Sequence, residues 1–365
     1  MDFSFSQEQE MLRESVAKLL TRKYDFDTRQ ALVASDAPWS ADVWTDFAEL
    51  GLTLLPFSEE HGGLGGSIAD LVAFAGSLGE YLVVEPYVAS TVLAGGALAE
   101  SGTAEALEWV EKLGSGEAIV AFAYEEGNGT ATSEQISMQV EVAGGQATLN
   151  GEKTLVIAGD DADALLVVAR ATDTGKLGFY LVEKGTSGLT TRPYKTIDGR
   201  AAATVRFDAV PATVLLEDAG DALDAILAKA IIVQCAEGLG AMKALLNLTS
   251  EYAMTRKQFG QPIGAFQVVA HRLADMKIAY TKALSTLTYT AALANSGAAT
   301  PRDIATLKGQ MGKLGREIGE AAIQTHGGVG MTDELSVSHY HKRILALDTA
   351  FGGYQYHLRR VGQMA

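Results

Sequence analysis

The stretch Arg256-Lys257-Gln258-Phe259-Gly260-Gln261-Pro262-Ile263 separates two long segments with helical patterning. Residues 226–254 before it and residues 266–295 after it carry apolar side chains at three- and four-residue spacing. A basic pair, an aromatic residue, a Gly and a Pro between them end one helix, turn the chain and begin the next. The stretch is therefore predicted to be the tip of a helical hairpin. Taken alone, it is read either as a solvated turn or as a site on that tip.

Length and charge limit the classes of protein to consider. The chain has 365 residues, of which 47% are apolar and 20% charged, as expected for a globular protein of two or three domains. Its 29 basic and 45 acidic side chains give a formal net charge of −16. Such a charge repels phosphate groups and anionic lipids, so neither nucleic acid nor a membrane surface is an expected partner. A protein with a basic face is compatible with it.

The single cysteine and the N-terminal residues indicate the compartment. Cys235 has no second cysteine to pair with, which fits a reducing compartment, and it is interpreted as a small buried hydrophobe rather than a reactive thiol. The N-terminal residues lack the basic start and apolar run of a signal peptide. No apolar run is expected to reach the ~20 residues that a membrane-spanning helix needs. A cytoplasmic protein without membrane insertion is predicted.

The texture of the sequence changes twice along the chain. Residues 1–114 show helical patterns, with Ser6 and Ser40 placed as N-caps of two of them. Residues 115–217 show short β-rich runs separated by turn residues, which predict an antiparallel sheet or small barrel. Residues 218–365 are helical again. The four elements expected there are residues 226–254, 266–295, 301–326 and 332–364.

Two features of the last segment could bind a phosphate-containing cofactor. Arg256 offers a planar fork of donors for phosphate oxygens, and Phe259 could stack on a flat ring. The turn Gln324-Thr325-His326-Gly327-Gly328-Val329-Gly330 would let a pyrophosphate or a flavin edge approach backbone amides closely. A glycine C-cap followed by a tight turn explains the same residues without a ligand.

Asp348 is the candidate acid–base residue. It follows apolar Ile344, Leu345 and Leu347 and precedes a cluster of small, aromatic and Gly residues. A carboxylate in an apolar setting has a raised pKa and can act as a general base. A helix-capping Asp is an equally good interpretation of this residue alone.

Other motifs point to no further chemistry. His326, His339 and His341 do not match the spacing of a metal site, and no metal is predicted. The sequence contains no G-x-S-x-G elbow, and no G-x-G-x-x-G lies between a strand and a helix. The loop from His61 to Gly66 lacks the Lys-Ser/Thr of a P-loop.

Five motifs in the same order resemble the acyl-CoA dehydrogenase family, and together they span nearly the whole chain. They are Phe3-Ser4-Phe5-Ser6-Gln7-Glu8-Gln9, Glu59-Glu60-His61-Gly62-Gly63, Asn150-Gly151-Glu152-Lys153, Arg256-Lys257-Gln258-Phe259-Gly260 and Gln324-x-x-Gly327-Gly328-x-Gly330. The resemblance implies an α+β protein with an N-terminal helical domain (1–114), a central antiparallel β-barrel domain (115–217) and a C-terminal four-helix bundle (218–365).

The resemblance also implies a cofactor and its contacts. Members of the family bind FAD, with the Arg and Phe of the hairpin reaching the FAD of a neighbouring subunit. The residues implied to contact the cofactor are Arg256, Gln258, Phe259, Gln267, Gln324, Gly327 and Gly328.

The activity implied is α,β-dehydrogenation of an acyl-CoA thioester. A carboxylate takes the α proton while the β hydrogen leaves as hydride to flavin N5, and hydrogen bonds to the thioester oxygen stabilise the developing enolate. An electron-transfer flavoprotein is the implied acceptor, and a homotetramer, or a heterotetramer with a large acyl-CoA dehydrogenase subunit, is the implied assembly.

The sequence departs from the family pattern where the flavin ring and the base are expected. Asp348 stands where the family usually has a Glu followed by Gly-Thr. The Asp side chain is one methylene group shorter than Glu, and a displacement of about 1 Å in a reacting group can cost ~100-fold in rate. A second branch of the family carries its Glu at a position that is Ala230 or Ile231 here. Leu155-Val156-Ile157 replaces the family's Trp-Ile-Thr, and Tyr124-Glu125-Glu126-Gly127-Asn128-Gly129-Thr130 replaces its Thr-Glu-Pro-Gly-Ala-Gly-Ser.

Three hypotheses follow from this mixture of match and mismatch. The chain is a complete dehydrogenase with Asp348 as catalytic base. Alternatively, it is the small subunit of a heteromeric acyl-CoA dehydrogenase of the kind that acts on dicarboxylic, aromatic or steroid side-chain acids. In that case it lends Arg256 and Phe259 to a FAD whose ring and base belong to a partner. The third hypothesis is a nitroalkane-oxidase-like flavoenzyme that uses Asp348.

Overall fold

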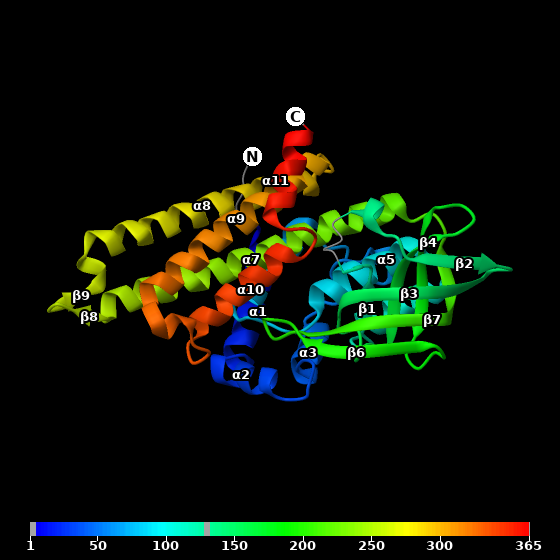
Figure 1. Ribbon diagram of the computed structural model, residues 1–365, viewed down its shortest axis with the longest axis horizontal. Coiled ribbons are helices and arrows are strands. Elements are labelled where there is room, and N and C mark those ends of the chain that lie inside the picture. The colour runs from blue at the N-terminus through cyan, green and yellow to red at the C-terminus, as the bar shows by residue number, and fades with distance from the viewer. Residues whose placement is uncertain (1–4, 128–131, 365) are drawn as a thin grey trace. The chain divides into compact units, whose positions relative to one another are not determined.

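The computed structural model describes residues 5–127 and 132–364, as helices and strands in the order predicted (Figure 1). The helices, with short 3-10 or π-helical segments marked η, are α1 (Gln7–Lys23), α2 (Phe26–Ala34), α3 (Ala41–Glu49), η1 (Glu59–His61), α4 (Ile68–Glu80), η2 (Val88–Ala94), α5 (Gly95–Ser101), α6 (Ala104–Gly114), η3 (Ser133–Gln135), α7 (Gly220–Thr255), η4 (Ile263–Ala265), α8 (Gln267–Asn295), α9 (Pro301–His326), η5 (Gly327–Met331), α10 (Ser336–Thr349) and α11 (Tyr354–Gln363). The strands are β1 (Val120–Ala123), β2 (Gln139–Ala143), β3 (Gln146–Ile157), β4 (Ala164–Ala171), β5 (Leu177–Glu183), β6 (Leu189–Lys195), β7 (Ala201–Leu216), β8 (Lys257–Gln258) and β9 (Gln261–Pro262).

By compactness, the chain divides into two units that do not follow its order. We call Met1–Gln30, Ile68–Val83 and Ile231–Ala365 the helical unit, and Ala31–Ser67 and Val84–Ala230 the β unit. The three consecutive segments 1–114, 115–217 and 218–365 are defined by helical and β-rich sequence patterns. Their assignment as three domains stays a prediction.

Capping residues position the first helices as expected. Ser6 and Gln9 form a capping box at the start of α1, in which each side chain binds the other residue's backbone N–H. The Ser40 side chain accepts from the N–H of Val43 at the start of α3, and Thr103 accepts from that of Ala106 at the start of α6. The helix starts predicted at Ser6 and Ser40 are confirmed.

Glycines on α9 let it pack closely against its neighbours in the helical unit. A methyl group added at Gly312 would lie 2.0 Å from the Asp348 carboxylate, and one added at Gly319 would lie 2.1 Å from the His341 ring. Gly315 lies between them on the same face, and a methyl group added there would lie 2.8 Å from Ile344 of α10. The side chains of α10 therefore occupy space that any larger residue on this face of α9 would need.

The last predicted helix, residues 332–364, is wrong as one element. α10 ends at Thr349 and α11 begins at Tyr354. Between them Phe351 has φ +58° and Gly352 has φ +87°, so the chain leaves the right-handed helical region shortly after Asp348. The Gly-Gly pair allows this break, as glycines do at helix ends.

The β unit contains a closed ring of strands. Hydrogen-bonded neighbours follow the order β4, β2, β3, β7 and β5, and β5 pairs again with β4. β1 extends the sheet from β4, and β6 pairs with β7. The barrel is confirmed, but its antiparallel character needs one correction: β1 and β2 both run parallel to β4. The other pairings in the ring are antiparallel.

α7 corrects the expectation about apolar runs. Within the described residues it is the one helix whose length and composition would allow it to cross a membrane. However, 83% of its most apolar window is buried inside the protein, as in the core helix of a globular domain. Its apolar character is therefore weak evidence for a membrane span.

Candidate functional site

The hairpin after α7 is a tight β-turn rather than an open loop. Lys257 pairs with Pro262, and Gln258 pairs with Gln261. The two residues of the turn, Phe259 and Gly260, have φ +52° and +84°. Positive φ at both positions is typical of the type I′ turn, which joins two-residue hairpins. Gly260 suits this geometry, whereas a bulky aromatic residue adopts it rarely and at a cost in free energy.

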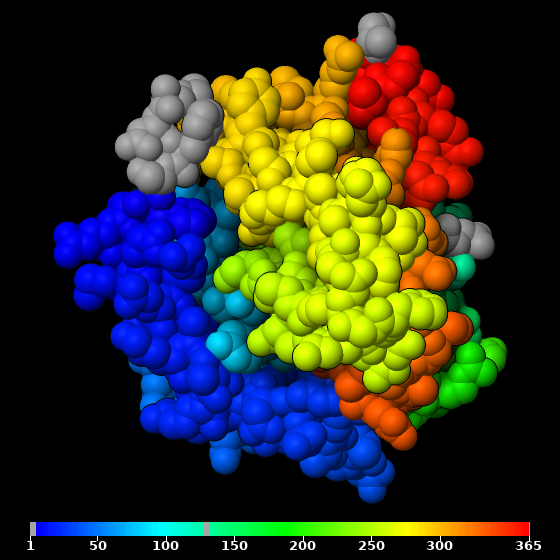
Figure 2. All heavy atoms as spheres, turned by 90° about the vertical axis from the view of Figure 1, so that its left-hand side faces the viewer, coloured from blue at the N-terminus to red at the C-terminus, as the bar shows by residue number. Residues whose placement is uncertain are grey.

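Phe259 is exposed as well as unusual in its backbone. Its side chain is 93% exposed, and its ring makes an edge-on contact with Phe266, with the centroids 6.1 Å apart. Figure 2 shows the end of α7, the hairpin and the start of α8, in yellow-green and yellow, at the front of the face that it draws. A large apolar ring held in solvent on a strained turn is the kind of feature that a binding partner covers.

The other predicted cofactor contacts of this region lie in the hairpin and at the start of α8. Arg256 precedes the hairpin, and its carbonyl accepts from the N–H of Ile263 at 2.8 Å. Arg256, Gln258 and Gln267 are all exposed, and Gln267 is the first residue of α8. The hairpin therefore presents a cation, amide groups and an aromatic ring together.

The glycine turn lies at the same end of the helical unit. α9 ends at His326, which is buried and stacks on Tyr252 in the last turns of α7, with the ring centroids 4.3 Å apart. Tyr252 is four residues before Arg256, so this stack joins the start of the glycine turn to the start of the hairpin. The sequence interpretation missed Tyr252, and it named His326 only within the glycine turn and among the histidines that match no metal site.

The glycine turn itself is open. Gly327 has φ +67°, and methyl groups added at Gly327 or Gly328 would meet no atom within 4 Å. Gln324 is exposed on the last turn of α9. The structure thus brings Gln324, Gly327 and Gly328 to the end of the unit that carries the hairpin, with space beside the backbone for a ligand.

Asp348 lies elsewhere, inside the helical unit. It is 4% exposed, at the C-terminal end of α10. Its carboxylate accepts a hydrogen bond of 2.9 Å from the N–H of Tyr354, the first residue of α11, and lies 3.7 Å from the Arg316 guanidinium. The helix-capping interpretation describes this geometry well, because the carboxylate satisfies a free N–H at a helix start.

Gly312→Ala tests how tightly Asp348 is held. The new methyl group would lie 2.0 Å from Asp348 Oδ1 and 2.8 Å from Tyr354 Cβ, so the cap must move. We expect a loss of about 2–3 kcal/mol in the free energy of unfolding, measured by urea denaturation. In Gly238→Ala the methyl group meets only Leu347 Cδ1 at 3.6 Å, so this control should be neutral or slightly stabilising. Equal effects of the two changes would contradict the packing described.

The β-unit positions that differ from the family pattern are placed as follows. Leu155 has φ +49° and lies where the pairing of β3 with β7 shifts register, and its N–H donates to Tyr194 Oη at 3.1 Å. Val156 is buried. The polar hydrogen-bonding side chain that the family places near Leu155 has no counterpart at these aliphatic positions.

Parts of two motifs lie outside the described residues, namely Phe3 and Ser4 of the first motif and Asn128, Gly129 and Thr130 of the second departing motif.

A buried ion pair anchors the Asn150-Gly151-Glu152-Lys153 motif. Lys153 is fully buried, and its amine donates to Glu126 Oε1 at 2.6 Å and to the Tyr124 carbonyl at 3.3 Å. Burial lowers the pKa of Lys153 to about 8, although Glu126 acts in the opposite direction. Burial raises the pKa of Glu126 and Lys153 lowers it, and the net effect is a lowered pKa.

Lys153 predicts a rise in stability at alkaline pH. Its folded pKa of about 8 is below the ordinary 10.5, so between these values the unfolded chain binds a proton that the folded chain does not. The free energy of unfolding should therefore increase with pH, by about 2 kcal/mol from pH ~8 to ~9.5. Urea denaturation of the wild type and of Lys153→Met at both pH values isolates this contribution. A slope that is identical in the two proteins would refute it.

Two further sequence interpretations concern sulfur and metals. Cys235 is buried, and burial raises the pKa of its thiol to about 12, which makes it a poor nucleophile and agrees with the small-hydrophobe interpretation. Across residues 5–127 and 132–364, no group of three or more His, Cys, Asp or Glu side chains is placed to hold a metal ion.

Comparison with known proteins identifies the family. The profile of the acyl-CoA dehydrogenase N-terminal domain matches residues 6–117, that of the middle domain residues 121–210, and that of the C-terminal domain residues 222–365. The chain belongs to the acyl-CoA dehydrogenase family. The predicted family, fold and class of enzyme, a flavoprotein oxidoreductase of acyl-CoA that uses FAD, are confirmed at this level.

Relatives of this acyl-CoA dehydrogenase family member match over its full length. Acyl-CoA dehydrogenase FadE27 of Mycobacterium tuberculosis is 29% identical, covering 100% of this chain and 98% of the relative. Acyl-CoA dehydrogenase IpdE2 of Mycolicibacterium smegmatis is 30% identical over 98% of each chain. A chain of the ChsE4-ChsE5 complex from Mycobacterium tuberculosis superposes with a TM-score of 0.90 at 28% identity, covering 100% of this chain and 98% of the other.

The residues of this family member fit FAD in part. Arg256 is an exposed cation of the kind that binds phosphate, Phe259 is an exposed aromatic ring, and the open Gly327-Gly328 turn leaves backbone accessible. These features suit the dinucleotide part of the cofactor. In the β unit, aliphatic Leu155 and buried Val156 offer no side-chain hydrogen bond to a flavin ring.

Proposed function

We propose that this chain is one subunit of a heteromeric acyl-CoA dehydrogenase that removes hydrogen from Cα and Cβ of an acyl-CoA thioester. In this proposal the chain lends Arg256, Gln258, Phe259 and Gln267 to FAD bound with a neighbouring large subunit. Gln324, Gly327 and Gly328 would contact the adenosine-diphosphate part. When bound, FAD supplies the acceptor for the hydride.

The position of the Asp348 carboxylate is the observation that supports a catalytic base from another subunit. A base that takes a proton from Cα must reach the substrate within hydrogen-bonding distance. The carboxylate is instead 4% exposed and bound to the N–H of Tyr354 and to Arg316 within the helical unit. We therefore propose that the carboxylate that abstracts the α proton comes from the partner subunit. Asp348 as the base of a self-sufficient enzyme is the competing prediction.

Similarity to proteins named as pairs of subunits supports the proposed assembly. The ChsE4-ChsE5 complex is one. A variant of the Tcur3481-Tcur3483 steroid ACAD is another, with a TM-score of 0.89 at 27% identity over 98% of this chain and 97% of the other. A heterotetramer with a large acyl-CoA dehydrogenase subunit extends this similarity to the present chain. An electron-transfer flavoprotein is the proposed acceptor, and the cytoplasm the proposed compartment.

The residues of this chain have three tasks in the proposed reaction. Arg256 would hold a phosphate of the cofactor through its guanidinium donors, and Phe259 would cover a flat part of the cofactor and exclude water. The Tyr252–His326 stack fixes the position of the hairpin relative to the glycine turn. Binding energy from the CoA group, remote from the reacting carbons, helps to orient the substrate.

The test of the reaction class is anaerobic reduction of the flavin in the reconstituted complex. A panel of acyl-CoA thioesters, including one with a steroid side chain, should bleach the flavin absorbance and form the enoyl-CoA. Bleaching by nitroalkanes without bleaching by any thioester would reject the proposal in favour of a nitroalkane-oxidase-like enzyme. The free acids of the same panel serve as controls, because they lack the CoA group.

A further inference from the structure

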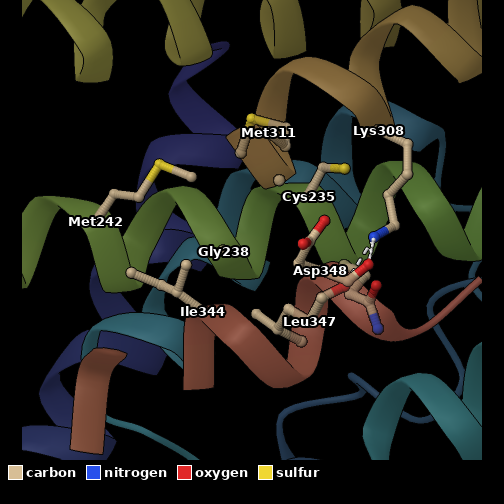
Figure 3. Close-up of a pocket in the computed structure, with 10 residues that line it drawn as sticks. Cys235, Gly238, Met242, Lys308, Met311, Ile344, Leu347 and Asp348 are labelled. Carbon is tan, nitrogen blue, oxygen red and sulfur yellow. Dashed lines mark hydrogen bonds between the residues drawn. The ribbon is translucent and has the colours of Figure 1, made fainter. Parts of the chain in front are cut away.

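A small cavity lies in the helical unit where α7, α9 and α10 meet (Figure 3). Its volume is about 20 Å³, and its polar lining consists of Gln234, Cys235, Lys308 and Asp348. A cavity needs roughly 10–15 Å³ of this measure to hold one water molecule. The cavity therefore has room for one water and not for a larger ligand.

Gln234, one of the residues that line this cavity, carries an unsatisfied polar atom. The residue is 5% exposed, and its side-chain Oε1 has no hydrogen-bond partner among the residues that the structure describes. A buried polar atom left without a partner costs about 1–3 kcal/mol. If the amide oxygen and nitrogen were exchanged, the buried position would hold an N–H donor instead of an acceptor, and it would still need a hydrogen-bond partner.

Lys308 brings a donor. Its side chain is 2% exposed, and its amine donates to the carbonyls of Leu347 and Asp348, both at 2.8 Å. An ammonium group has three N–H donors, so one remains after these two bonds. Burial lowers the pKa of Lys308, and the nearby Cys235 and Asp348 act against this shift.

Asp348 brings acceptors. One of its carboxylate oxygens accepts from the Tyr354 N–H, and two carboxylate oxygens have about four acceptor positions between them. Figure 3 shows the Asp348 carboxylate and the Lys308 amine at the same pocket, next to Cys235. In one small space, the Lys308 ammonium group repels a cation and the Asp348 carboxylate repels an anion. The ligand that suits both is neutral and is both a donor and an acceptor.

We propose that this cavity is a binding site for a single structural water molecule. The water accepts a hydrogen bond from Lys308 Nζ and donates to Gln234 Oε1 and to the Asp348 carboxylate. It joins α7, α9 and the C-terminal end of α10, and it satisfies the buried amide oxygen. This water fixes the orientation of the carboxylate that caps α11, whichever subunit supplies the catalytic base.

Gln234→Met distinguishes a hydrated cavity from a dry one by the direction of its effect. Methionine has nearly the same shape and removes the amide. If the cavity holds the water, the change removes one of its partners and should lower Tm by about 2–4 °C. If the cavity is dry, the change removes an unsatisfied polar atom and should raise Tm by a similar amount, which would overturn the proposal.

Two further measurements complete the test. Asn247→Met on the exposed face of α7 measures the effect of a Met substitution on the same helix away from the cavity, and its shift is subtracted. A high-resolution crystal structure of the full chain, in its complex, should show one water within hydrogen-bonding distance of Gln234, Lys308 and Asp348. Absence of density there, with Gln234 Oε1 still unpartnered, would overturn the proposal even if Gln234→Met is too unstable to study.

Discussion

Replacing Arg256 and Phe259 together by alanine should remove most of the flavin from the complex and leave the chain folded. Arg256 is expected to hold a phosphate and Phe259 to stack on a ring of the cofactor. A charge-assisted hydrogen bond and an aromatic stack together are worth about 2–4 kcal/mol, on the order of 30- to 1000-fold in Kd. Phe259 is 93% exposed, so its removal leaves no internal cavity.

The measurement is the ratio of flavin absorbance to protein after gel filtration, with circular dichroism as the check on folding. Lys257→Ala is the matched control, because it removes one positive charge from the same exposed hairpin without touching the two proposed contacts. It should keep the flavin. Full flavin occupancy in the double variant would show that the hairpin does not hold the cofactor.

Asp348→Asn should keep flavin reduction within a few-fold of the wild type while lowering stability. Asparagine retains an oxygen that can accept from the Tyr354 N–H, but it loses the charge that faces Arg316. We expect a loss of about 1 kcal/mol in the free energy of unfolding, and a larger loss of about 2–4 kcal/mol for Asp348→Ala, which also leaves a cavity.

The rate of flavin bleaching by acyl-CoA separates the two roles of this residue. Removing a general base typically costs a factor of about 10² to 10⁴. A loss of that size in Asp348→Asn, with the complex and its flavin intact, would make Asp348 the catalytic base and reject the division of labour between subunits. Arg316→Gln is the control, because it disturbs the same cap without altering the carboxylate.

Local signals predicted the features of the fold that depend on local chemistry. Capping by Ser6 and Ser40 and the change from helical to β-rich texture are visible in short stretches of sequence, and both agree with the structure. α2 was missed, because its nine residues carry little amphipathic pattern. The parallel alignment of β1 and β2 with β4 was missed too, since side-chain alternation says nothing about which strand lies alongside.

The candidate site shows the same limit. The hairpin tip was predicted, but the positive φ of Phe259 was not, because an Asn-Gly or Gly-Gly pair is the usual signal of such a turn. Asp348 was placed in an apolar setting because of its neighbours Ile344 and Leu347. Its partners, Arg316 and Tyr354, belong to other helices, and no local sequence pattern predicts these contacts.

In the proposed assembly, this chain completes a FAD site that it does not hold alone. The most direct test is the visible spectrum of the chain purified by itself and after co-expression with a large acyl-CoA dehydrogenase subunit encoded beside it. We predict little or no bound flavin for the chain alone, and stoichiometric flavin that an acyl-CoA bleaches for the pair. Stoichiometric flavin that an acyl-CoA bleaches in the isolated chain would contradict the account.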